Sequence, residues 1–186
     1  LFFFTIRSTR DKYEEKIQKP LKSKRFLGKI NSNAVIMEEI KMRVLENCEP
    51  KRVFYYFEEI CKIPHGSRNT KQISDYLVNF AKDHGFDYVQ DELNNVVIYK
   101  PATAGYENAP TVILQGHMDM VCEKRPDVEH DFEKDGLNLS VKDGYVSANG
   151  TTLGGDDGIA VAYALALLDS TDIPHPALEV LVTVDE

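Results

Sequence analysis

Two short apolar runs constrain the fold of this chain most strongly. They are TVILQG at residues 111–116 and LEVLVTV at residues 178–184. Nearly continuous apolar runs of this length are typical of strands in the middle of a sheet that is covered on both faces. Between them, DDGIAVAYALALLD at residues 156–169 is rich in small apolar residues and favours a helix. The two runs therefore predict a layered protein with buried strands.

Further helices and strands are expected before and between these runs. Apolar residues recur at helical spacing in residues 50–64 and again in residues 69–85. Strands are predicted at residues 86–92 and 94–100, and a β-hairpin at residues 139–150, where Asp-Gly marks the turn. Because helices alternate with strands, the expected fold class is α/β, with a mixed central sheet and flanking helices.

The distribution of charge separates the chain into two parts. The formal net charge is −8, which argues against a nucleic-acid partner, because such proteins need a basic face. Residues 1–36 nevertheless hold nine Lys or Arg against three Asp or Glu, so we expect a basic leader there, disordered or non-native. Three cysteines without a CxxC pair fit a reducing, cytoplasmic setting, and no apolar run is long enough to span a membrane.

A histidine and an aspartate follow the first apolar run directly. His117 and Asp119 stand at the carboxyl end of the predicted strand, where open α/β sheets bind their ligands. A neutral imidazole can bind zinc through one nitrogen while a nearby carboxylate accepts the N–H of the other. An ordinary His–Asp surface pair gives the same triplet, so the pair alone does not establish a metal site.

Two adjacent acids open the predicted helix at residues 156–169. In GTTLGGDDG, Asp156 and Asp157 follow two glycines. Carboxylates at a helix N-terminus are stabilised by the helix dipole, so a helix cap is one explanation. The second is metal binding, since one carboxylate can bridge two divalent cations. Asp156 is the candidate bridge.

The second apolar run also ends in acids, Asp185 and Glu186. Polar strand ends are common, so these two residues alone indicate little. Together with the histidine and the paired aspartates, however, they place metal-binding side chains after buried strands or at a helix start. One edge of a single sheet would bring such residues together.

These residues lie in a series of segments that resembles aminoacyl-histidine dipeptidases, the carnosinase-like Xaa-His dipeptidases. These are di-zinc peptidases related to carboxypeptidase G and aminotripeptidase. The resemblance runs from about Val53 to Glu186 and includes ICKIPHGS, NNVVIYKPATAGYEN, LQGHMDMVCEK, HDFEKD, GTTLGGDDGIAVA and HPALEVLVTVDE. It implies hydrolysis of short peptides by a water molecule that the metals activate.

The resemblance also assigns roles to individual residues. It implies that His117 binds the first zinc ion, Asp119 orients His117, Asp156 bridges two zinc ions, and Glu186 is the general base. Manganese or cobalt can replace zinc. A cis peptide bond is implied between Asp156 and Asp157, and at the second of these positions the family often has Asn.

Several parts that the resemblance implies lie beyond these 186 residues. They are a second glutamate directly after the base, a later aspartate, a distant histidine, and a lid or dimerisation domain. Of the implied ligands, the chain contains His117 and Asp156 for the first metal and Asp156 for the second. We therefore expect residues 37–186 to form the N-terminal part of the catalytic domain, inactive alone, of an enzyme that is a homodimer when complete.

Two alternatives remain at this stage. The first is a catalytically dead product that binds metal weakly or associates with another protein, for which LEVLVTV, as an unpaired strand, would supply an adhesive edge. The second is a related enzyme with another substrate, an aminotripeptidase or an amidohydrolase.

Overall fold

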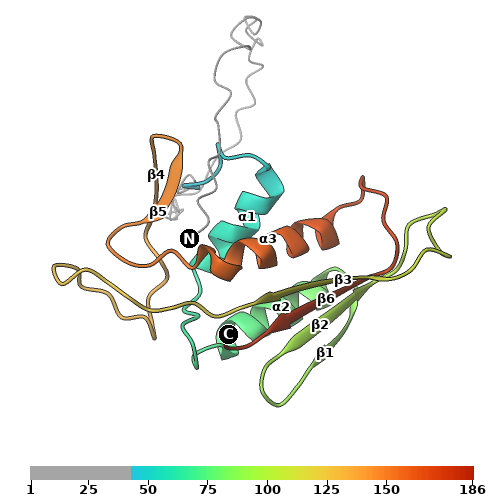
Figure 1. Cartoon of the computed structure of the whole chain (residues 1–186), viewed down its shortest axis with the longest axis horizontal. Helices are drawn as coiled ribbons and strands as arrows, with labels where there is room; N and C mark the ends of the chain where they lie inside the picture. Colours follow the sequence, from blue (N-terminus) through green and yellow to red (C-terminus); the bar gives the residue numbers. More distant parts are fainter. Residues whose placement is uncertain (1–42) are drawn as a thin grey trace, which may run out of the picture.

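The computed structural model describes residues 43–186, which form a mixed sheet packed against helices (Figure 1). The strand order is β1-β2-β6-β3, and a separate hairpin is made by β4 and β5. In chain order the elements are α1 (Lys51–Cys61), α2 (Lys71–Asp83), β1 (Asp87–Gln90), β2 (Val96–Lys100), β3 (Val112–His117), β4 (Leu139–Lys142), β5 (Tyr145–Ala148), α3 (Gly155–Asp169) and β6 (Leu178–Thr183). The predicted α/β class is confirmed.

Residues 1–36, the predicted basic leader, lie outside the described residues, so the division of the chain at residue 36 stays a prediction. From residue 43 onward, no helix has both the length and the apolar character that crossing a membrane requires.

Helices α1 and α3 pack against each other above the sheet (Figure 1). The helical spacing of apolar residues in α1 buries Phe54, Phe57 and Ile60, each at most 4% exposed. The small residues of α3 allow this close packing, and Ala162 and Leu165 are fully buried. The apolar pattern of the sequence therefore predicted both helices and the buried face of α1, whereas for α3 it indicated only a helix made mostly of small residues.

The sheet is mixed because β6 pairs in parallel with β3 and antiparallel with β2. The register places Ile98 beside Val180, and Val96 beside Val182, all at most 1% exposed. These side chains share the face that packs on the helices. Ile113 and Val89 lie on the opposite face, where they are 62% and 53% exposed.

Two sequence predictions about the sheet are wrong. The run TVILQG was expected in the middle of a sheet covered on both faces, but β3 is an edge strand in the described part, and Val112 is 42% exposed. For the run LEVLVTV, the predicted buried strand is confirmed, but the alternative of an unpaired edge is wrong, because β6 pairs on both sides. The apolar character of a strand indicates that it needs burial, but it does not determine strand order.

Candidate metal centre

The carboxyl ends of β3 and β6 meet at one edge of the sheet, next to the start of α3 (Figure 1). Because these two strands are parallel and pair His117 with Thr183, the residues that follow both strands emerge on the same side. Asp156 lies in the first turn of α3. The structure thus brings together the segments that the sequence analysis selected.

His117 lies at the centre of this group, with its side chain 13% exposed. Its Nδ1 is 3.1 Å from Asp119 Oδ1, and its Nε2 is 3.2 Å from Asp156 Oδ1 and 4.0 Å from Glu186 Oε2. Burial disfavours the charged imidazole, but hydrogen bonds with Asp156 and Asp119 outweigh this effect and raise the pKa of His117. Both ring nitrogens therefore face carboxylate oxygens.

Asp119 is a buried carboxylate, 5% exposed, and each of its oxygens has a hydrogen-bond donor. Oδ1 accepts from the Nδ1–H of His117, and Oδ2 accepts from the hydroxyl of Ser67 at 2.5 Å. The backbone carbonyl of Asp119 is a second acceptor for the same Nδ1–H, at 3.1 Å. These contacts direct the Nε2 of His117 towards Asp156.

Asp156 does not act as a helix cap. The residue that precedes α3 is Gly154, in the left-handed conformation at φ 68°, and no side chain caps the helix. Asp156 itself is non-helical, its side chain is 89% exposed, and its carboxylate faces His117. The peptide bond from Asp156 to Asp157 is cis, as the resemblance implied. The geometry does not support the first explanation for the paired acids, a helix cap at Asp156.

Asp157 packs beneath the histidine. Partial burial is the main cause of the raised pKa of its carboxyl group, and the neighbouring His117 opposes this effect. Its Oδ2 lies only 2.8 Å from the position that a Cβ would take at Gly116. Asp157 therefore packs directly against the end of β3, beside Gly116, the residue that precedes His117.

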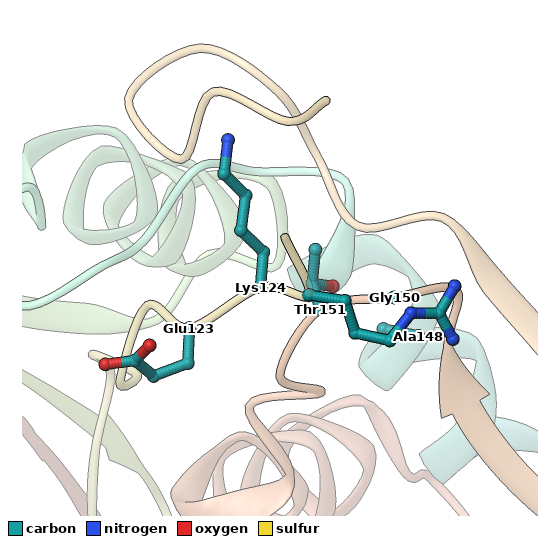
Figure 2. Close-up of a pocket in the computed structure, with 6 residues that line it drawn as sticks. Glu123, Lys124, Ala148, Gly150 and Thr151 are labelled. Carbon is teal, nitrogen blue, oxygen red and sulfur yellow. The ribbon is translucent and has the colours of Figure 1, made fainter. Parts of the chain in front are cut away.

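A separate hollow of about 390 Å³ lies between the segment after β3 and the segment before α3 (Figure 2). Its lining residues are Glu123, Lys124, Arg125, Ala148, Gly150 and Thr151. Lys124 donates to the carbonyl of His130, and Arg125 pairs with Asp127. Because both cations already have partners, this hollow is a weaker candidate for a functional site than the group around His117.

Comparison with known proteins gives a clear relative, although no protein-family profile matches the chain. A cytosol non-specific dipeptidase from Escherichia coli is 44% identical over 145 residues, which is 78% of this chain and 30% of that protein. The chain is therefore similar to one part of this dipeptidase. It spans about a third of the length of the curated relative.

Solved structures agree with this similarity to a dipeptidase. The aminoacylhistidine dipeptidase from Vibrio alginolyticus is 43% identical, with a TM-score of 0.75, over 76% of this chain and 29% of that one. A tripeptidase from Staphylococcus aureus is 26% identical, with a TM-score of 0.58, over 72% of this chain and 36% of that one. The shared architecture is a partial peptidase domain.

The donor set around His117 fits a metal ion in part. His117 supplies a nitrogen held by a carboxylate, and Asp156 supplies an exposed carboxylate oxygen close to it. Zinc accepts both ligand types. Among residues 43–186, however, no three His, Cys, Asp or Glu side chains form a ready ion site. The described residues thus provide two donors and a nearby third carboxylate, Glu186.

Sequence reasoning did not find two contacts of this group. Ser67 lies 52 positions before Asp119, and its hydroxyl belongs to no metal-binding pattern. Asp157 was selected as one of two paired acids and as a position where the family often has Asn, but its place beside Gly116 at the end of β3 was not predicted. Neither contact leaves a signal in spacing or composition.

Replacing Gly116 with alanine is expected to destabilise the chain by about 1–3 kcal/mol, as overpacking does. The new Cβ would lie 2.8 Å from Asp157 Oδ2 and 3.4 Å from Ala160 Cβ. Urea unfolding measures the loss. Gly155→Ala is the control, because a Cβ there meets only Leu153 at 3.9 Å. Equal stability of the two variants would show that Asp157 does not occupy the space beside β3.

Proposed function

We propose that this chain carries part of the active site of a zinc-dependent dipeptidase that cleaves short peptides of the Xaa-His type. The observation that supports this most is His117, held by Asp119 on one nitrogen and facing Asp156 and Glu186 with the other. The name of the Vibrio relative supports the Xaa-His preference. A cytoplasmic homodimer with two zinc ions, or manganese or cobalt, belongs to the same proposal.

In this proposal His117 and Asp156 are the metal ligands. Asp119 keeps the proton of His117 on Nδ1, so that Nε2 has a free lone pair for the metal. Asp156 has its carboxylate largely exposed, with one oxygen near Nε2 and the other open to a second ion. The chemistry that zinc supplies when bound is Lewis-acid polarisation of a carbonyl and a lowered pKa for water.

Glu186 is the general base in this proposal. Its side chain is 79% exposed and lies next to the Nε2 edge of His117, so it can reach a water molecule placed beside Asp156. The carboxylate takes a proton from the attacking water and later gives it to the nitrogen of the leaving amino acid. Because one residue handles both transfers, the protons balance over the cycle.

Zinc binding is the first expected result. Isothermal titration of the purified chain with zinc should show one binding event that a chelator reverses, and no turnover of a Xaa-His dipeptide. Two protein donors are fewer than the three of a typical catalytic zinc, which is why turnover is not expected. Absence of zinc binding would contradict the ligand assignment. Chelator-sensitive turnover would contradict an incomplete donor set.

A chimaera tests the activity itself. Residues 43–186 of this chain would replace the aligned segment of the Vibrio dipeptidase, which covers 29% of that protein. The chimaera is expected to hydrolyse a Xaa-His dipeptide in a zinc-dependent manner. A folded chimaera that binds zinc but does not turn over dipeptides or tripeptides would contradict the proposed function, and preference for tripeptides would favour the aminotripeptidase alternative.

A role in protein association is the second candidate function, and one observation favours it. Val112 and Ile113 expose apolar side chains on the edge strand β3. Exposed apolar strand edges pair with other chains. Light scattering over a concentration series distinguishes a monomer from an associating chain, and a monomer throughout would argue against this candidate.

A further inference from the structure

One turn of the chain contacts all three segments that form the candidate metal centre. It comprises residues 65–68, directly after Pro64, and we call it the 65–68 turn. Gly66 forms an isolated bridge with Met120, which places the turn beside the segment that follows β3. Backbone hydrogen bonds in both directions secure this position, from Met120 N–H to His65 O at 3.0 Å and from Ser67 N–H to Met120 O at 3.2 Å.

The turn also contacts the start of α3 and the end of the chain after β6. The imidazole of His65 is 3% exposed, and its Nε2 lies 3.3 Å from the position of a Cβ on Gly154. The backbone N–H of Arg68 donates to Asp185 Oδ1 at 2.9 Å, next to Glu186. The segment after β3, the start of α3 and the segment after β6 thus all contact this one turn.

We propose that Ser67 is a positioning residue for this centre, whose hydroxyl fixes the Asp119 carboxylate and, through it, the imidazole of His117. Asp119 Oδ1 holds the ring, while Oδ2 accepts from Ser67. A carboxylate turns easily about its last side-chain bond, so a single hydrogen bond leaves its plane undetermined. Two donors on opposite oxygens define that plane, and with it the orientation of the ring.

The placement of the proton on His117 follows from this arrangement. The Nδ1 side of the ring faces two acceptors of Asp119, its buried carboxylate and its carbonyl. The Nε2 side faces Asp156, whose carboxylate is 89% exposed and can be satisfied by water. The neutral ring therefore keeps its proton on Nδ1 and presents the lone pair of Nε2 to the metal position.

The metal-binding part of this inference rests on the proposed function, but the proton placement does not. The test therefore begins without metal or substrate. Imidazole ¹⁵N NMR spectra are recorded at alkaline pH, where the ring is neutral, and His117→Gln identifies the signals of His117. The parent chain is expected to show one tautomer, with Nδ1 protonated. Ser67→Ala is expected to show a mixture of both tautomers.

Two further variants keep this test decisive. Ser67→Thr retains the hydroxyl and is expected to restore the single tautomer, whereas Ser67→Cys keeps the size, donates weakly and is expected to behave like Ser67→Ala. Ser140→Ala is the matched control, because its hydroxyl bonds only within the β4–β5 hairpin region. If Ser67→Ala does not fold, Ser67→Cys replaces it in the test, and the same mixture of tautomers is expected.

Zinc titration supplies the second measurement. Ser67 acts on His117 through Asp119, so its removal is expected to weaken zinc binding roughly 3- to 10-fold, less than the 10- to 100-fold typical of direct partners of a metal ligand. A Ser67→Ala chain with a single Nδ1–H tautomer would overturn the proposal. Failure of the parent to bind zinc would overturn the proposed function alone, because the tautomer measurement is independent of it.

Discussion

Replacing Gly154 with alanine is expected to lower the free energy of unfolding by about 2–5 kcal/mol. Gly154 precedes α3 and adopts a left-handed conformation, with φ 68°. An L-residue with a side chain pays about 1–2 kcal/mol for this conformation. The remainder of the loss comes from crowding, at about 1–3 kcal/mol for an overpacked buried site.

The crowding at Gly154 has identified neighbours. A Cβ would lie 3.0 Å from Met120 Sδ, 3.2 Å from Met120 Cβ and 3.3 Å from His65 Nε2. Met120 is 2% exposed and His65 is 3% exposed, so neither side chain has free space to move into. Because both belong to the segments that surround Asp119, the variant is also expected to displace Asp156 from His117 and to weaken zinc binding.

Gly85 provides a matched control for this prediction. It follows α2 with φ 69°, almost the same conformation, and a Cβ there meets nothing within 4 Å. Gly85→Ala is therefore expected to lose only the conformational part, about 1–2 kcal/mol. Urea unfolding of the two variants and the parent measures both losses. Equal losses would show that the contacts with Met120 and His65 contribute nothing.

The secondary structure was predictable because each element carries its own pattern. Helical spacing of apolar residues gave α1 and α2, and Asp143-Gly144 gave the turn between β4 and β5, where both residues have positive φ. The edge position of β3 was not predictable, because strand order depends on pairing between distant segments. An apolar strand such as β3 is compatible with either place in the sheet.

The candidate site was predictable only where chemistry and position coincide. His117 and Asp156 were found because a ligand residue directly follows a strand or opens a helix, and the structure places them 3.2 Å apart. Ser67 was not found, because a serine in a turn carries no chemical signal. Its role appears only when the fold brings the 65–68 turn beside Asp119.

Replacing His117 with alanine is expected to weaken zinc binding roughly 100-fold. Structural zinc sites bind with about 10–16 kcal/mol, which is roughly 3 kcal/mol for each of four ligands, and 1.4 kcal/mol corresponds to a factor of ten. His117 is the one nitrogen donor in the described group around Asp156. Isothermal titration with zinc measures the change.

His84→Ala is the control. It removes a histidine–aspartate pair that lies outside the candidate metal centre, so it shows the effect of losing such a pair on zinc affinity. His84 Nε2 is 3.2 Å from Asp169 Oδ1, the same separation as between His117 and Asp156, but its Nδ1 bonds to the carbonyl of Phe80 rather than to a carboxylate. Zinc affinity is therefore expected to stay at the parent value in His84→Ala. Equal losses in the two variants would mean that zinc binds unspecifically to surface histidines, and retention of tight binding by His117→Ala would remove His117 from the ligand set. Because the two pairs share one distance, the comparison tests whether zinc selects the group around His117 over another histidine–aspartate pair.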